Sequence, residues 1–444
     1  MSLWPSPWPA EDGGPERSQA PSGLPGLAIA AGERLATCAV RDAFASTMVV
    51  LRDPGEVYLL RHTMGARPHV DPTTCWVERM DPVTLEPLER SRELAAGPFW
   101  PGGMLAHADG SLHVVFGRHC HRLSPGLEVL AARELPVDAP YNSLVVLGDG
   151  TLAMKDIDRG LARPATLTLL DPATLEPRCE DVRLAESAVA RLSAHEDRLY
   201  AVGASAVHGW RWDGRALTRE LEVPYLERGG QSYGWDPVIE GGHLWFLDNG
   251  AHDYTSTMLN AGVSAGPVHL HRISLSDPAD REMIEICGRP RGAVTNPPLY
   301  DPDRRIAVGY DSANAVLAAF RMGDRLERLW ERPLAHAAHM IRYPDTGELI
   351  VADWSGPALA GSALARAIGP RAGWAPRSRM IRAAAARAGG DDVLVLDIES
   401  GAEIARAHVP GMFQSVLFPA PGWDRDLYWC TFSTVARLQV RPAG

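Results

Sequence analysis

Polar side chains recur in this sequence where short apolar runs begin and where the following runs end. They form four pairs: Asn142 with Asp156, Asp236 with Asp248, Asn296 with Asp311, and His339 with Asp353. Carboxylate and amide oxygens are ligands of hard divalent cations, and clustered carboxylates repel one another unless a cation or an arginine lies among them. The pattern predicts a divalent-cation site, with Ca²⁺ favoured, whose ligands are Asn142, Asp236, Asn296, Asp156, Asp248 and Asp311. The alternative is that each Asp caps a turn by accepting backbone N–H groups.

A cation in such a site could polarise a carbonyl group, so hydrolysis of an ester or lactone is the predicted reaction. His339 or Asp353 would act as the general base. Arginine binds carboxylate and phosphate groups in a bidentate manner. We therefore expect a small, anionic substrate, bound by four further polar residues: Arg61, Arg118, Gln414 and Arg377.

Lys155 is the one lysine among the 44 basic residues and stands beside Asp156. A desolvated lysine can act as a base or form a Schiff base, which arginine cannot do. With His339 and Gln414 it would support a lyase, an isomerase or an oxygenase. A genome that replaces lysine by arginine explains the same observation without a function, and this is the favoured explanation.

Two redox cofactors are less favoured than a hard cation. His119-Cys-His121 puts two imidazoles on one side of a strand, as a chelate for Fe²⁺ would require, but no segment matches the motifs of four-histidine iron oxygenases. Pyrroloquinoline quinone (PQQ) is covered by a vicinal cysteine pair in quinoprotein dehydrogenases. The six cysteines of this chain include no such pair, which argues against PQQ.

An internal repeat indicates how these residues are positioned. Asp81–Pro87 (DPVTLEP) and Asp171–Pro177 (DPATLEP) nearly coincide and lie 90 positions apart (171 minus 81), which is two units of about 45 residues, the length of a four-stranded propeller blade. Asp-Pro and Asp-Gly turns mark eight inner and seven outer hairpins. The predicted blades begin near residues 46, 101, 141, 188, 234, 294, 337 and 412.

The last unit, 415–440, has only three predicted strands, and a segment near residues 33–40 could supply the fourth. Sharing one blade between the two chain ends closes a ring without a free edge. The sequence therefore predicts an all-β protein, a single β-propeller of eight four-stranded blades over residues 27–444, with seven blades as the alternative.

Antiparallel order brings the beginning of a blade's first strand and the end of its second strand to one mouth of the channel. Insertions at 63–74, 249–267 and 354–390 fall at the same mouth. The last is rich in Ala and Arg, contains Arg377, and is expected to form a helical, basic lid. The lid could clamp an anion, or it could be a solvated face that balances an acidic body.

The segment from Asn142 through the Asp149-Gly150 turn to Asp156 resembles the channel mouth of the regucalcin–gluconolactonase, paraoxonase and strictosidine-synthase-like propellers, and Asn296 to Asp311 does so more loosely. The resemblance covers two or three blades and identifies no single family. It implies an oxygen-ligated cation such as Ca²⁺ and hydrolysis of an ester or lactone. Those families have six blades, whereas this sequence predicts eight.

Composition excludes several partners. A net charge of −11 and a pI near 5.8 offer no basic face for nucleic acid or an acidic membrane. Residues 1–26 are rich in Pro, Gly and Ser, without a signal-peptide pattern, and are expected to form a disordered tail. No apolar run could span a membrane, so a cytoplasmic location is expected. A non-catalytic propeller that binds a ligand or protein remains a third hypothesis.

Overall fold

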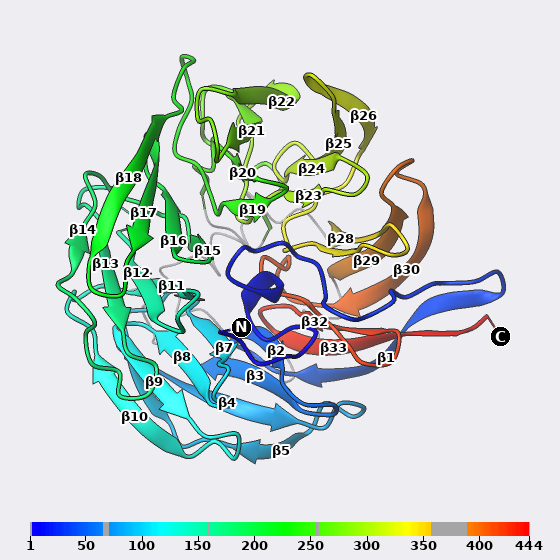
Figure 1. Ribbon diagram of the computed structural model, residues 1–444. Helices are drawn as coiled ribbons and strands as arrows, with labels where there is room; N and C mark the ends of the chain where they lie inside the picture. Colours follow the sequence, from blue (N-terminus) through cyan, green and yellow to red (C-terminus); the bar gives the residue numbers. More distant parts are fainter. Residues whose placement is uncertain (1, 65–70, 159, 254–256, 357–388, 444) are drawn as a thin grey trace.

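A computed structural model gives the fold, and it describes residues 2–64, 71–158, 160–253, 257–356 and 389–443. Eight antiparallel sheets are arranged in a ring around a central channel (Figure 1). Each sheet has four strands in sequence order from the channel outward, apart from the two places noted below. The predicted eight-bladed β-propeller is therefore confirmed, and the alternative of seven blades is wrong.

Blades 1 to 4 contain these strands: β2 (Ser46–Leu51), β3 (Val57–His62), β4 (Thr73–Met80) and β5 (Pro87–Arg90), with β6 (Leu94–Gly97) also pairing with β4; β7 (Gly103–Ala106), β8 (Leu112–Phe116), β9 (His119–Leu123) and β10 (Val129–Glu134); β11 (Tyr141–Val146), β12 (Leu152–Asp156), β13 (Thr166–Leu170) and β14 (Val182–Arg183); β15 (Leu192–His195), β16 (Arg198–Val202), β17 (Ala206–Trp212) and β18 (Leu217–Pro224).

Blades 5 to 8 contain these strands: β19 (Val238–Glu240), β20 (His243–Leu247), β21 (Pro267–Ser274) and β22 (Arg281–Pro290); β23 (Leu299–Asp301), β24 (Ile306–Asp311), β25 (Val316–Met322) and β26 (Leu326–Arg332); β27 (Ile341–Tyr343), β28 (Glu348–Trp354), β29 (Gly390–Asp397) and β30 (Glu403–Pro410); β31 (Ala420–Pro421), β32 (Asp426–Cys430), β33 (Thr434–Pro442) and β1 (Glu33–Asp42).

The repeated DPxTLEP motif forms the same turn in blades 1 and 3. Oδ1 of Asp81 accepts hydrogen bonds from the amides of Val83 and Thr84, and Asp171 caps its own turn in the same way. The leucine of each motif, Leu85 or Leu175, is buried at a positive φ. The motif therefore encodes a hairpin turn that closes on an apolar anchor.

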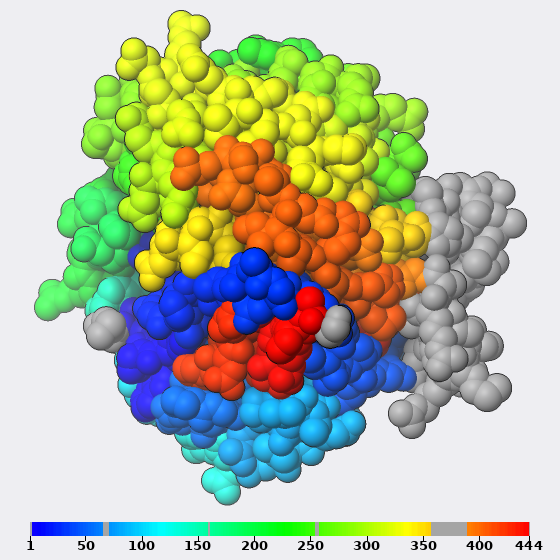
Figure 2. All heavy atoms as spheres, turned by 90° about the vertical axis from the view of Figure 1, so that its right-hand side faces the viewer, coloured from blue at the N-terminus to red at the C-terminus, as the bar shows by residue number. Residues whose placement is uncertain are grey.

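The eighth blade joins the two ends of the chain. β1 pairs with β33 from Glu33↔Pro442 to Asp42↔Thr434, and it completes the sheet β1-β33-β32-β31. The red C-terminal and blue N-terminal atoms lie side by side in Figure 2. The last blade therefore has four strands rather than three, and the pairing of the two chain ends closes the ring.

Residues 2–26 are not a disordered tail, which corrects the expectation from composition. They run through the middle of the ring and include the short 3-10 helix η1 (Glu11–Gly13) (Figure 1). Their backbone hydrogen-bonds to inner strands of several blades, for example Ala106 N to Pro9 O at 2.7 Å, Ile239 N to Glu16 O at 2.8 Å and Arg342 N to Gln19 O at 2.9 Å. Inner strand edges have unpaired backbone groups that supply these partners, so tertiary contacts order a segment that has little structure of its own.

Burial follows the order of strands in each blade. The inner strands β2, β11 and β12 are buried along their whole length, whereas the outer strands β5 and β18 are mainly exposed. The core therefore lies between adjacent blades. In the described part of the chain, no helix has the length and hydrophobicity needed to cross a bilayer. The predicted lid falls largely on 357–388, which lie outside the described residues.

Candidate functional site

Three of the residues predicted at the beginning of inner strands do meet around the channel, but with partners from the N-terminal segment. We call the resulting set of charged groups the channel cluster: Glu11, Asp12, Arg17, Arg191, Asp236 and His339. Each of these residues is at most 5% exposed. The third predicted residue, Asn142, contributes its backbone carbonyl, which accepts a hydrogen bond from Arg191.

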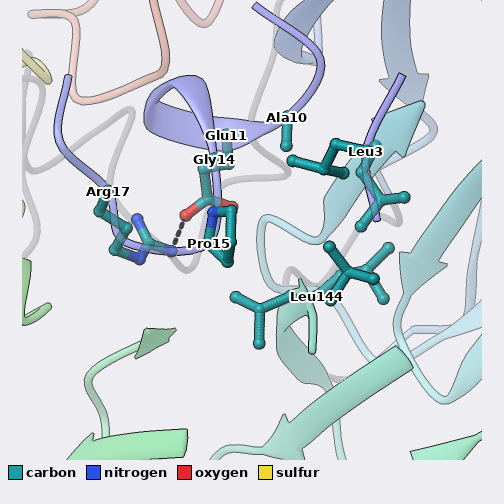
Figure 3. A pocket seen from close by; sticks show the side chains of 10 residues that line it. Leu3, Ala10, Glu11, Gly14, Pro15, Arg17 and Leu144 are labelled. Atoms are coloured by element: carbon teal, nitrogen blue, oxygen red, sulfur yellow. Dashed lines mark hydrogen bonds and ion pairs between the residues drawn. The ribbon is translucent and has the colours of Figure 1, made fainter. Parts of the chain in front are cut away.

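Two arginines lie among the acidic groups of the channel cluster. Arg17 pairs with Glu11 and Asp12, and Oδ2 of Asp236 lies 3.8 Å from its guanidinium (Figure 3 shows the pair with Glu11). Arg191 lies 2.8 Å from Glu11. Burial alone would raise the pKa of Asp12, but His339 and the arginines outweigh it and lower that pKa. The carboxyl group of Asp12 therefore stays ionised beside His339.

The predicted amide ligands join neighbouring blades. Nδ2 of Asn142 donates to Val189 O at 2.7 Å, and Nδ2 of Asn296 donates to the carbonyls of Ala337 and Val416. Gln414 donates to Ala335 O, and its Oε1 accepts from Thr257 and Met258 of the 249–267 insertion. These hydrogen bonds hold blades and insertion together.

Lys155 is fully buried next to the channel. Its Nζ donates to Ala188 O at 2.8 Å, Asp156 O at 3.0 Å and Asn142 Oδ1 at 3.3 Å. Burial lowers its pKa to about 8. Three acceptors around one compact ammonium group match the three donors of lysine and not the planar fork of arginine. The need for this geometry explains the presence of lysine here without a reactive role.

Three of the four carboxylates at the ends of second strands cap loops within their own blades. Asp156 accepts from Arg163 and from the amide of Thr166. Asp311 accepts from Ala293 N and from Asn314. Asp353 accepts from Ala335 N. Burial raises the pKa of Asp311 and of Asp353. Their bonds are those of the turn-capping alternative, and they do not converge on one cation.

The predicted substrate-binding residues Arg61 and Arg118 have partners outside the channel cluster. Arg61 donates to Glu78 at 3.0 Å and to Phe44 O. Arg118 pairs with Glu134 and Asp138, both at 2.9 Å. Arg377 lies outside the described residues.

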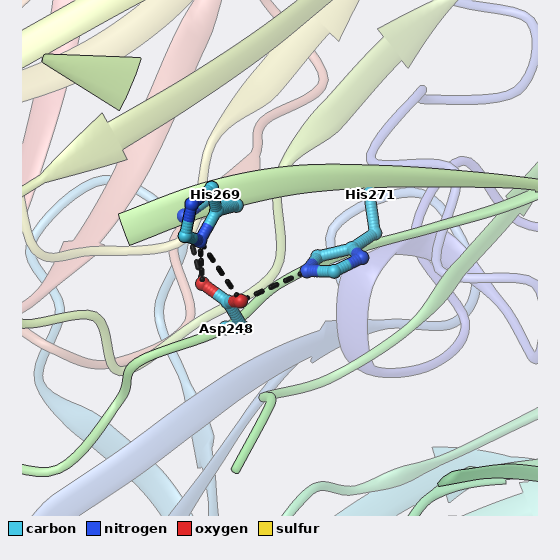
Figure 4. Close-up of side chains that lie close together, drawn as sticks. All are labelled: Asp248, His269 and His271. Carbon is cyan, nitrogen blue, oxygen red and sulfur yellow. Dashed lines mark hydrogen bonds and ion pairs between the residues drawn. The ribbon is translucent and has the colours of Figure 1, made fainter. Parts of the chain in front are cut away.

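Asp248, the fourth carboxylate, has different partners: two histidines of the neighbouring strand (Figure 4). Its Oδ2 lies 3.0 Å from Nδ1 of His269 and 3.0 Å from Nε2 of His271. Phe246 pairs with His271 between β20 and β21, and side chains two apart share a face, so the three groups project together. Among the described residues, this is the one place where three or more His, Cys, Asp or Glu ligand atoms lie within 4.8 Å of one another.

The Asp248 carboxylate is buried and held in a fixed orientation. Oδ1 accepts the backbone amide of His269 at 2.8 Å, and Oδ2 accepts Nε2 of Gln231 at 2.7 Å. Burial would raise the pKa of Asp248, yet the electrostatic interaction with His271 and hydrogen bonds with both histidines lower it. His271 is stacked on Phe246 with ring centroids 4.4 Å apart. A cavity of about 40 Å³ beside His271 is lined in part by Tyr225 and Met283.

Asp248 is among the residues predicted from the sequence, whereas its two histidine partners are not. The available signal was the alternation His269-Leu-His271, which puts both imidazoles on one face of a strand. The same alternation at His119-Cys-His121, taken as a possible chelate, has another use: these histidines bond the carbonyls of Ala96 and Ala95. The two histidine pairs differ because a carboxylate from the adjacent strand, Asp248, lies beside His269 and His271. This neighbour is apparent only in the folded structure.

Comparisons with known proteins agree with the fold. No family model and no curated protein matches the sequence. Among solved structures, the quinohemoprotein alcohol dehydrogenase ADHIIG from Pseudomonas putida HK5 is similar over 99% of this chain and 81% of its own, at 8% identity and a TM-score of 0.59. BamB from Moraxella catarrhalis (84% and 95% covered, 13% identity, TM-score 0.46) and virginiamycin B lyase from Staphylococcus aureus (70% and 94%, 10%, 0.45) are also similar.

At 8% identity, the similarity to the quinohemoprotein alcohol dehydrogenase shows the fold alone. The class of protein is therefore an eight-bladed β-propeller, with no single family identified.

Proposed function

We propose that this propeller is a metal-dependent enzyme whose divalent cation is held by Asp248, His269 and His271. The observation that carries the proposal is the convergence of one carboxylate and two imidazoles from adjacent strands in a buried position. Ligand atoms around a first-row cation with bonds of about 2.1 Å lie roughly 3.0–3.4 Å apart. The 3.0 Å separations of Asp248 Oδ2 from both histidine nitrogens fit that range.

The ligand set favours a transition metal over the Ca²⁺ expected from the sequence. Imidazole suits Zn²⁺, Fe²⁺, Co²⁺ and Ni²⁺, whereas Ca²⁺ takes oxygen ligands. Three protein ligands leave coordination positions for water or substrate, as in catalytic rather than structural zinc sites. The cavity beside His271 is large enough for a few water molecules, each needing about 10–15 Å³.

The proposed reaction is hydrolysis of a small ester or lactone, in which the bound metal would lower the pKa of a water molecule and polarise the carbonyl group. Gln231 and the backbone amide of His269 orient the Asp248 carboxylate, as outer hydrogen bonds do around metal ligands. An oxygenase is the second candidate, because two histidines and one carboxylate also form the facial triad of non-haem Fe²⁺ enzymes.

The metal content of the purified protein tests this proposal. Protein purified without an affinity tag is analysed by mass spectrometry, before and after EDTA, and is titrated with Zn²⁺, Fe²⁺ and Mn²⁺. We expect about one equivalent of a transition metal and a melting temperature that EDTA lowers. Asp248→Asn and His271→Gln should abolish binding. His195→Gln, which changes a histidine that is 51% exposed, should not.

The identity of the metal separates the two reactions. Zinc with EDTA-sensitive hydrolysis in a panel of small esters and lactones supports the hydrolase. Iron with substrate-dependent oxygen uptake supports the oxygenase. A wild-type protein that binds none of the three metals stoichiometrically would show that Asp248 and the histidines form only a hydrogen-bonded network.

A further inference from the structure

A second cavity lies far out on the ring, between blades 3 and 4. It has a volume of about 270 Å³. Its lining residues, which we call the rim groove, are Val182, Arg183, Leu184, Ala185, His208, Trp210, Leu217 and Arg219.

The shortness of β14 creates the rim groove. This outer strand has only two residues, which pair with Thr166 and Leu167 of β13. The outer strands of blade 4 are longer: β17 has seven residues and β18 has eight. Figure 1 places β14 at the outer edge of the ring, where β17 and β18 are its neighbours. The facing surface of blade 4 is therefore left without a full partner strand.

His208 gives the rim groove an unsatisfied polar atom. The residue is 2% exposed, its Nε2 lies 2.8 Å from Oε1 of Glu186, and its Nδ1 has no hydrogen-bond partner. Burial would raise the pKa of Glu186, but hydrogen bonds from His208, Ser205 and the Ala206 amide lower it. With its proton on Nε2, which faces Glu186, a neutral His208 would present the lone pair of Nδ1 to a ligand. An O–H or N–H group of a ligand would satisfy it and offset the desolvation of this buried atom.

The other walls provide an aromatic platform and positive charge. Trp210 is 3% exposed and lies beside His208, with ring centroids 6.0 Å apart. Arg183 and Arg219 are exposed at the mouth of the groove. Arg219 already donates to Glu222 at 2.6 Å, so a bound anion would share that guanidinium, whereas Arg183 offers a second one. A ligand with an aromatic ring, an anionic group and a hydroxyl group would therefore find a partner for each: Trp210, the two arginines and His208.

We propose that the rim groove binds a small hydroxylated aromatic acid. Its ring would lie against Trp210, its carboxylate would pair with Arg183 and Arg219, and its hydroxyl group would donate to Nδ1 of His208. The volume approaches the lower end of known ligand pockets, which begin at about 300 Å³, and it suits a single ring. This site is separate from Asp248, His269 and His271 and does not depend on the metal.

The test uses the full chain, with 4-hydroxybenzoate as the probe. Isothermal titration and saturation-transfer NMR measure its binding, alongside benzoate, which lacks the hydroxyl group, and 4-hydroxybenzamide, which lacks the charge. We expect saturable binding at one site and at least five-fold weaker binding of each analogue. EDTA treatment should leave the affinity unchanged, so failure of the metal proposal would not affect the result.

Two variants locate the binding site. Arg183→Gln changes an exposed residue and is expected to fold normally, with at least five-fold weaker binding of 4-hydroxybenzoate. His208→Phe should remove the preference for 4-hydroxybenzoate over benzoate. Arg211→Gln, on β17 but outside the groove, serves as the control with parental affinity. No saturable binding of any probe up to millimolar concentration, or equal binding by Arg183→Gln and the parent protein, would overturn the proposal.

Discussion

The carboxylate of Asp12 lies 2.8 Å from Nδ1 of His339, although the two residues are far apart in the sequence. Both side chains are 1% exposed. His339 stands just before the inner strand of blade 7, and Asp12 belongs to η1 inside the channel. The contact makes the N-terminal segment a part of the core, since its charged groups complete those of the ring.

Replacing Arg17 tests this role of the N-terminal segment. Arg17→Met removes the arginine that pairs with Glu11 and Asp12 and lies 3.8 Å from Asp236, whereas Arg191 remains beside Glu11 and Asp236. Removing one partner of a buried ion pair costs about 3–5 kcal/mol, because a buried charge is left uncompensated. We expect a melting temperature several degrees below that of the parent, and faster hydrogen exchange of the Ala106, Ile239 and Arg342 amides, which bond to the segment.

The matched control for Arg17 is Arg34→Met, an exposed position on β1, where the change should lie within about 0.5 kcal/mol. If Arg17→Met had the same melting temperature as Arg34→Met and the exchange rates of the parent, the N-terminal segment would contribute little to the stability of the ring.

Because of Asp391, we expect the free energy of unfolding to fall as pH rises. Its side chain lies in β29 and is buried, and burial, with the charges of Asp353 and Asp392, raises its pKa to about 7. Between the unfolded pKa near 4 and this value, the folded state holds a proton that the unfolded state has released. Folding stability is therefore lost across about pH 4 to 7, by on the order of 2–4 kcal/mol for a shift of this size.

Asp391→Asn should remove this pH-dependent loss of folding stability, because an amide does not titrate. Urea unfolding at pH 5 and pH 8 should show a variant that gains stability relative to the parent at pH 8 and much less at pH 5. Asp303→Asn, in an exposed turn, should follow the parent at both values. A pH-independent difference between Asp391→Asn and the parent would mean that Asp391 is already ionised in the folded protein.

The sequence predicts the ring better than the site, for physical reasons. Turn residues act locally: Asp81 and Asp171 cap their own hairpins, so the repeat can be recognised from short segments. The blade starts at 46 and 141 coincide with β2 and β11, whereas the start near 412 lies before β31 at Ala420. Residues 2–26 have no local pattern, because the inner strands of several blades determine their structure.

The candidate site depends on distances that the sequence does not contain. Asp156 and Asp248 both end a second strand and look equivalent in sequence. The residues opposite them differ: Asp156 meets Arg163 and the Thr166 amide, and Asp248 meets His269 and His271. A carboxylate beside an arginine is neutralised, whereas one between two imidazoles can bind a metal. The segment that follows the second strand, either the loop or the third strand, decides the outcome.

Lys155 is predicted to be a structural ion. Lys155→Met should destabilise the protein by about 2–4 kcal/mol, because the carbonyls of Ala188 and Asp156 and the Asn142 amide lose their shared donor. Thermal melting measures the effect. Lys155→Arg should also destabilise, since a guanidinium cannot direct its hydrogens at these three acceptors from one point. Covalent trapping of Lys155 by a carbonyl compound and borohydride would instead establish a reactive amine.

Gln231 tests whether the surroundings of Asp248 serve metal binding. Its Nε2 donates to Asp248 Oδ2 at 2.7 Å, and its Oε1 accepts the amides of Glu227 and Arg228. Loss of such an outer hydrogen bond typically weakens metal affinity by about 10–100-fold. Gln231→Leu should therefore weaken metal binding within that range, as measured by competition with a chromophoric chelator. Gln439→Leu, which removes an exposed contact with Asp424 O, is the control and should bind as the parent does. Equal affinity in both variants would show that Gln231 orders only its own loop, and that the Asp248 carboxylate is oriented by the His269 amide alone.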